Sequence, residues 1–112
     1  MTGNDDNALE FNKKGGEGSI SVTANIAPKI CSEFQKFSNL KNSTANEDEA
    51  KKLDNILQPL HQAMFVESNP SPVKFAAKQL GLCDDSVRLP LVKVTNKTKD
   101  IVNSALKNAK LI

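Results

Sequence analysis

The sequence contains neither tryptophan nor tyrosine, and its 112 residues include a single arginine. The 15 basic and 13 acidic side chains are spread along the chain without a dense basic block, and the five phenylalanines do not alternate with lysines. Electrostatic capture of a polyanion and stacking on nucleobases both depend on such features. We therefore expect no nucleic acid partner.

Long apolar runs are also missing. No stretch approaches the roughly 20 apolar residues that a membrane-spanning helix needs. The polar start Thr2-Gly3-Asn4-Asp5-Asp6 lacks the apolar segment of a secretory signal peptide. We expect no membrane association and a cytoplasmic location.

Soft metal ligands are few. Cys31 and Cys83 lie far apart, no Cys-x-x-Cys pair occurs, and His61 is the sole histidine. Isolated cysteines in such a chain are typical of free thiols buried in a core, and a metal site needs more ligands at closer spacing. We expect two free, mostly buried thiols, no metal and no cofactor.

Apolar residues at helical spacing dominate the chain after Asn25. Pro59 is expected to bend the longest helix without ending it, and Ser38–Asn46 to form a polar loop. N-caps are expected at Asn25 or Thr23, at Ser71, and at Thr95 or Thr98. The helices that we expect are Asp5–Lys14, Asn25–Phe37, Glu47–Val66, Ser71–Leu80 and one running from the Thr95 or Thr98 cap to about Ala109.

One segment predicts a strand instead. Gly15-Gly16-Glu17-Gly18 ends the first helix, and Ser19–Thr23 is rich in β-branched residues. The glycines follow a helix and precede a strand, which is the reverse of a phosphate-binding loop. A strand needs hydrogen-bonding neighbours, and Leu91–Val94 alone offers a weak second one. The pattern indicates the end of a larger α/β protein, and Cys83–Thr95 is expected to be an extended connector.

Few residues suggest chemistry by themselves. Asp5 and Asp6 fit either substrate contacts or a metal-binding pair, although negative charge at a helix N-terminus is the simpler interpretation. His61 has no serine or cysteine partner at a recognisable spacing, so we interpret it as a packing or capping residue. No lysine stands in apolar surroundings that would favour imine formation. The residues alone reveal no catalytic centre.

Several blocks in order resemble the C-terminal third of the 4-hydroxy-tetrahydrodipicolinate synthase (dihydrodipicolinate synthase) family. These blocks are Gly3-Asn4-Asp5-Asp6, Ile20-Ser21-Val22-Thr23-Ala24-Asn25, Pro59-Leu60-His61 and Asn69-Pro70. The resemblance implies the α/β class, with a chain that is itself mostly α. Residues 1–40 would be the last βα units of a (β/α)8 (TIM) barrel, from the stub of the seventh strand to the eighth helix. Residues 41–112 would be a C-terminal extension of three helices.

The same resemblance implies a lyase that condenses pyruvate with L-aspartate 4-semialdehyde through a lysine Schiff base, in diaminopimelate and lysine biosynthesis. The family's lysine and catalytic tyrosines would lie upstream of Met1, so this chain would carry no catalytic residue and be inactive alone. Ile20 would lie with its backbone against pyruvate, Gly3 at the lip of the site, and Asp5 near the distal end of the substrate.

The expected partners are an N-terminal barrel portion and, by analogy with the family, further subunits of a homotetramer. Two other hypotheses stay open. The chain would be a catalytically dead remnant, or a small helical module that binds another protein through its apolar faces.

Overall fold

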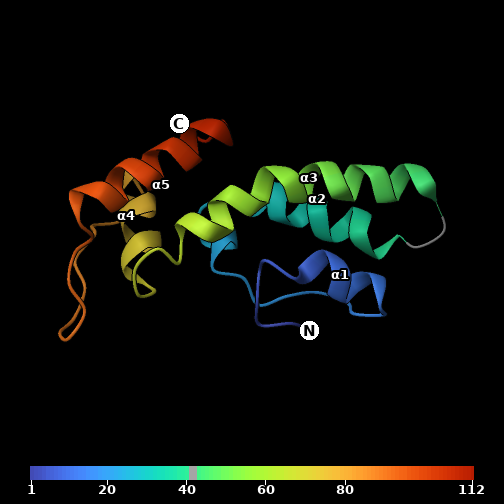
Figure 1. The fold of residues 1–112 in the computed structure, drawn as a ribbon, viewed down its shortest axis with the longest axis horizontal. Helices are drawn as coiled ribbons and strands as arrows, with labels where there is room; N and C mark the ends of the chain where they lie inside the picture. Colours follow the sequence, from blue (N-terminus) through green and yellow to red (C-terminus); the bar gives the residue numbers. More distant parts are fainter. Residues whose placement is uncertain (41–42) are drawn as a thin grey trace.

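The computed structural model describes residues 1–40 and 43–112, and Figure 1 shows their fold. The molecule is elongated, with extents of 46 × 26 × 21 Å. The prediction of a mostly helical chain is confirmed. The elements are α1 (Ala8–Lys13), the 3₁₀ helix η1 (Thr23–Asn25), α2 (Pro28–Asn39), α3 (Thr44–Ala63), α4 (Ser71–Gln79) and α5 (Asn96–Asn108).

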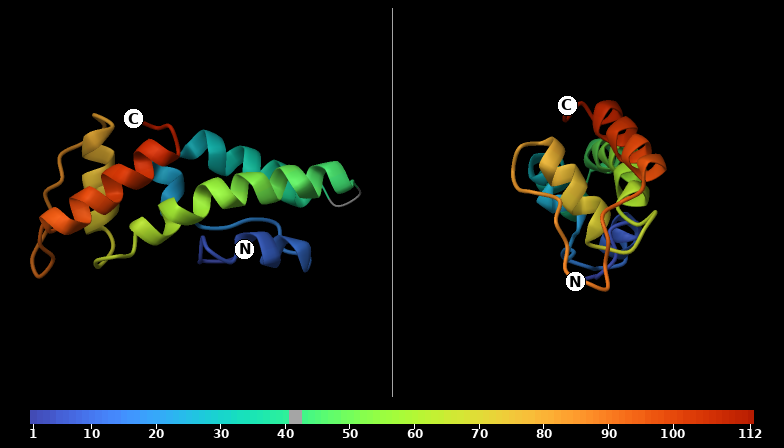
Figure 2. Two further views of the ribbon diagram at one scale, coloured as in Figure 1. Left: turned by 45° about the horizontal axis from the view of Figure 1, so that its top comes forward. Right: turned by 90° about the vertical axis from the view of Figure 1, so that its left-hand side faces the viewer.

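Helices α2 and α3 lie side by side along the long axis and run in opposite directions (Figures 1 and 2). Helix α1 packs beneath this pair, α5 packs on α3, and α4 packs on α5 and η1. Where these helices meet, α3 contributes the fully buried Leu57 and Leu60, its C-cap residue Met64 is also fully buried, and α5 contributes Val102 and Leu106. Each such side chain contributes about 1.5–3 kcal/mol on burial, so this contact forms the centre of the core.

Pro59 lies inside α3 without ending it, as predicted, while the bend expected there stays a prediction. The helix begins three residues before the predicted Glu47 and ends at Ala63. The predicted loop Ser38–Asn46 is shorter at both ends, because α2 continues to Asn39 and α3 begins at Thr44. Residues 41–42 of this loop lie outside the described part of the chain.

The predicted N-caps are right in one case of three. Thr95 caps α5, where its hydroxyl accepts a hydrogen bond from the Thr98 backbone at 3.3 Å. Ser71 is the first residue of α4 rather than its cap. Helix α2 starts after Ala27, because Thr23 and Asn25 belong to η1 and are not free to cap the next helix.

The connector between α4 and α5 is extended, as predicted, and a buried carboxylate holds it in place. Asp85 lies 2.8 Å from the Lys78 Nζ atom of α4 and 3.0 Å from the Lys93 Nζ atom. The hydrogen bonds from Lys78 and Lys93 hold the pKa of Asp85 far below its usual range. The Asp85 side chain thus links two parts of the connector, at Asp85 and at Lys93, to each other and to α4.

The predicted strand Ser19–Thr23 is wrong. Within residues 1–40 and 43–112 the segment forms a single parallel bridge, between Thr2 and Ser19, and Thr23 already begins η1. Leu91–Val94 does not pair with it. A ladder needs a partner of several residues, and the segment before α1 turns away after Thr2.

Helix α1 is also shorter than predicted, starting at Ala8 rather than Asp5. Among the described residues, no helix is both long enough and apolar enough to cross a membrane.

Candidate functional site

Two segments on either side of α1, one at Thr2 and one from Gly18 to Ile20, meet near the N-terminus of the chain. The Thr2 backbone N–H donates to the Gly18 carbonyl at 3.0 Å, and the Ile20 N–H donates to the Thr2 carbonyl at 2.9 Å. Figure 1 shows the two segments converging near the N-terminal label. This pairing brings Gly3 and Ile20, two of the residues expected at a substrate site, next to each other.

The side chain of Asp5 adds hydrogen bonds between the same two segments. Its Oδ2 atom accepts hydrogen bonds from the backbone N–H groups of Val22 at 2.9 Å and Thr23 at 3.2 Å. The carboxylate is buried. The simpler interpretation, negative charge at the start of α1, is therefore wrong, because α1 begins three residues later and the carboxylate is bonded to another segment.

Ile20 lies between these two attachments with its side chain 70% exposed. Its N–H is used, but its carbonyl accepts no hydrogen bond from the described residues. An unpaired carbonyl on an exposed residue is free to interact with water or with a ligand. Gly3 is exposed as well, and no atom lies within 4 Å of the position that a Cβ would take there.

A buried pair of side chains supports this segment from α3. The Thr23 Oγ1 atom lies 2.7 Å from His61 Nδ1, and both side chains are buried. Burial lowers the pKa of His61, although the nearby carboxylates of Asp5, Asp54 and Asp6 act in the opposite direction. The prediction of a packing histidine is confirmed in its burial, but its partner is 38 residues away and no local pattern pointed to it.

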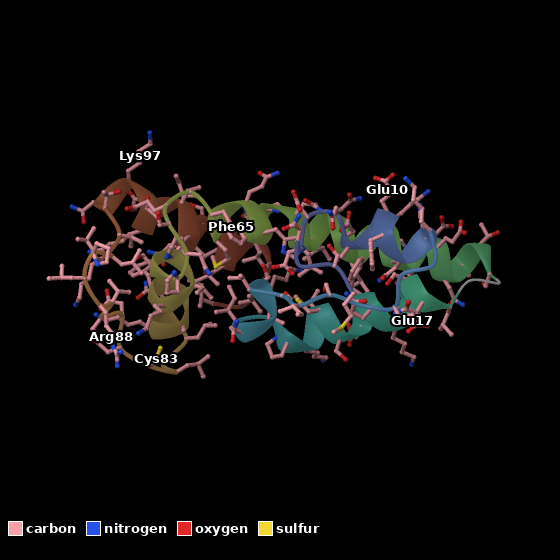
Figure 3. The ribbon with its side chains drawn as sticks, turned by 90° about the horizontal axis from the view of Figure 1, so that it is seen from below. Glu10, Glu17, Phe65, Cys83, Arg88 and Lys97 are labelled. Carbon is pink, nitrogen blue, oxygen red and sulfur yellow. The ribbon has the colours of Figure 1, made fainter. Side chains whose placement is uncertain are left out.

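A cleft of about 380 Å³ opens beside this pair. Its lining combines the N-terminal segment with the end of α3: Asn4, Asp5, Asp6, His61, Gln62 and Phe65. Phe65, labelled in Figure 3, lies just beyond α3 and is more than half exposed. The cleft therefore has one acidic wall and one wall that combines two polar side chains with the ring of Phe65.

The two cysteines differ. Cys31 is buried near Asp5 and Ser21, and burial raises the pKa of its thiol to about 11. Cys83 is exposed, so the prediction of two mostly buried thiols is wrong for it, because it lies in the connector after α4 (Figure 3). Among residues 1–40 and 43–112, no three histidine, cysteine or acidic side chains lie close enough to hold a metal ion.

Among the lysines of residues 1–40 and 43–112, two have a displaced pKa, and the direction is unfavourable for a nucleophile. A hydrogen bond to Glu10 raises the pKa of Lys14, and one to Asp85 raises the pKa of Lys78. Imine formation needs an uncharged amine, so these environments disfavour it.

Solved structures of dihydrodipicolinate synthases are similar to this chain. One is the chloride-inhibited enzyme from Acinetobacter baumannii complexed with pyruvate, with 43% identity over 98% of this chain and 36% of that one, and a TM-score of 0.90. Another is a monomeric variant, with 36% identity over 98% of this chain and 35% of that one, and a TM-score of 0.85. The chain therefore has the fold of part of a (β/α)8 barrel enzyme with its helical extension.

The sequence comparisons agree. The profile of the dihydrodipicolinate synthetase family matches residues 1–109, and the chain belongs to this family. The 4-hydroxy-tetrahydrodipicolinate synthase of Pelagibacter ubique (strain HTCC1062) is 70% identical over all 112 residues, and that of Cereibacter sphaeroides (strain ATCC 17025 / ATH 2.4.3) is 46% identical. The chain spans 38% and 37% of the length of these two relatives.

Proposed function

We propose that this chain supplies the closing part of a lyase barrel that condenses pyruvate with L-aspartate 4-semialdehyde in diaminopimelate and lysine biosynthesis. Its relatives carry the name 4-hydroxy-tetrahydrodipicolinate synthase, and one similar structure holds pyruvate. The chain spans little more than a third of those relatives, so the nucleophilic lysine and the catalytic tyrosines come from an upstream barrel portion. This chain alone forms no imine with pyruvate.

The observation that carries the proposal is the unpaired carbonyl of Ile20. It lies on a segment that is attached on both sides, through the Ile20 N–H to Thr2 and through the Val22 and Thr23 N–H groups to Asp5. Pyruvate has no hydrogen-bond donor of its own, so a backbone held in this way would lie against it by direct contact, without rearrangement of the chain. We assign it to pyruvate, with Gly3 at the lip of the site. Asp5 contributes by shaping the segment, and its role at the distal end of the substrate stays a weaker part of the proposal.

This assignment gives the two parts of the chain different roles. Residues 1–40 complete the barrel, and residues 41–112 form the helical extension that packs on it. The active protein works in the cytoplasm as a homotetramer, although a monomeric variant exists among the similar structures.

The test joins this chain to the upstream part of the Pelagibacter ubique relative in place of its 70% identical segment. We expect the joined protein to consume pyruvate in the presence of L-aspartate 4-semialdehyde, and borohydride to trap pyruvate on one upstream lysine. The 112-residue chain is the matched control and traps none. Pyruvate trapped on one specific lysine of the chain alone, or a folded joined protein without activity, would contradict the proposal.

A further inference from the structure

The position of the Ile20 carbonyl depends on how the short segment from Ile20 to Thr23 is attached. Its two ends are fixed by backbone N–H donors, at Ile20 to Thr2 and at Val22 and Thr23 to the Asp5 carboxylate. These contacts all come from residues 1–6. They orient the segment relative to the N-terminal stretch but not relative to the long helices.

The Thr23 side chain provides an attachment to α3. Its hydroxyl lies 2.7 Å from His61 Nδ1, and the threonine is completely buried. His61 is in the last turn of α3, directly after Leu60, which is also completely buried in the core. Tight packing around Leu60 fixes the helix, so the imidazole is a rigid partner for the hydroxyl.

We propose that His61 and Thr23 are positioning residues, which set the Ile20 carbonyl at the distance that pyruvate requires. This inference rests on the proposed function, because it assigns a role to residues of the same site. Neither residue touches pyruvate. They act through the backbone between Thr23 and Ile20. The contact with His61 fixes Thr23, and the hydrogen bonds from the Val22 and Thr23 N–H groups to Asp5 hold the backbone that leads to Ile20.

The experiment uses the protein joined to the upstream barrel portion and compares two variants of one residue. Thr23→Val keeps the shape and removes the hydroxyl, whereas Thr23→Ser keeps the hydroxyl. Loss of a neutral hydrogen bond is worth about 1 kcal/mol, which corresponds to about a fivefold change in an equilibrium. We expect Thr23→Val to raise the KM for pyruvate about fivefold, to leave the KM for L-aspartate 4-semialdehyde unchanged, and Thr23→Ser to restore the pyruvate value.

Thr98→Val is the matched control, because Thr98 is a buried threonine in α5 that hydrogen-bonds away from the site. We expect this control to lower the melting temperature with both KM values unchanged. If Thr23→Val does not fold, His61→Phe removes the same hydrogen bond while keeping a buried ring, and the same rise in the pyruvate KM is expected.

The outcomes separate the two proposals. An active parent protein whose pyruvate KM is unchanged by Thr23→Val and His61→Phe, with only the melting temperature lowered, overturns the positioning role and leaves the proposed function standing. A folded parent protein that neither binds nor consumes pyruvate removes the proposed function, and this inference with it.

Discussion

Replacing Asp5 by alanine should destabilise the chain by about 3 kcal/mol. The carboxylate accepts two backbone N–H groups on a single oxygen atom, from Val22 at 2.9 Å and Thr23 at 3.2 Å. Hydrogen bonds to a charged acceptor contribute about 1.5–3 kcal/mol each. The two contributions are not additive, because they share Oδ2 and because Val22 is only half-buried, so water replaces part of the loss at that residue. Thr23 is completely buried, and its N–H is left without a partner.

The measurement is urea unfolding at pH 7, followed by circular dichroism at 222 nm, on the parent chain and two variants. Asp6→Ala is the matched control, since it removes the same charge one residue later from an exposed side chain. Surface substitutions of this kind change the free energy of unfolding by less than about 0.5 kcal/mol. Comparing the two variants therefore cancels the change in net charge.

The slope of the transition adds a second readout. We expect Asp5→Ala to lower the urea midpoint without changing the slope, since the surface exposed on unfolding is nearly the same. If Asp5→Ala and Asp6→Ala unfold at the same midpoint, the Asp5 carboxylate does not hold the Ile20–Thr23 segment, and the account of the site given above is refuted.

Three further predictions concern the core, the thiols and the histidine. Leu60→Ala should cost about 2–5 kcal/mol in the free energy of unfolding, because the side chain is completely buried. At pH 8, a thiol reagent should modify the exposed Cys83 rapidly and Cys31 only on unfolding, since burial raises the pKa of Cys31 to about 11. The contribution of His61 to the free energy of unfolding should be full above about pH 6.5 and should fall as the pH drops below it. The reason is that the pKa of His61 is lower in the folded state, which therefore binds the proton more weakly than the unfolded state.

Each of these predictions has its own control. Ile56→Ala, on the exposed face of the same helix, should cost much less than Leu60→Ala, and equal costs would contradict the assigned core. Rapid reaction of Cys31 in the folded chain would show that it is accessible. His61→Phe should weaken the fall in stability between pH 7 and 5.5, and an unchanged pH dependence would mean that another group causes it.

The helices could be predicted from the sequence because their signals are local. The spacing of Leu53, Leu57, Leu60 and Met64 marks the buried side of α3, and it continues across Pro59. The predicted first residues of α1 and α2 differ from the observed ones by three residues, because the side chains expected at these helix starts belong to other parts of the structure. Asp5 was expected at the start of a helix, but it binds a segment 17 residues later, which no periodic pattern could reveal.

The candidate site residues were predicted for a different reason, and their role stays a prediction. Gly3, Asp5 and Ile20 came from resemblance to a family, and the structure brings all three to one place through the Thr2–Ser19 bridge. His61 was noticed only as a lone histidine. Its contact with Thr23 joins residues 38 positions apart, and a histidine without a nearby nucleophile in the sequence carries no signal of such a contact.

The segment from Gly18 to Thr23 is rich in β-branched residues and yet forms only one bridge, so its order depends on side chains. Asp5 accepts two backbone N–H groups of this segment, and His61 holds the Thr23 hydroxyl. The apolar side chains of Met1 and Ile20 remain 80% and 70% exposed beside this segment. Covering both with an upstream barrel portion would contribute about 3 kcal/mol or more. Association with that portion is therefore favoured by the same surface that carries the Ile20 carbonyl, which links completion of the barrel to completion of the proposed pyruvate site.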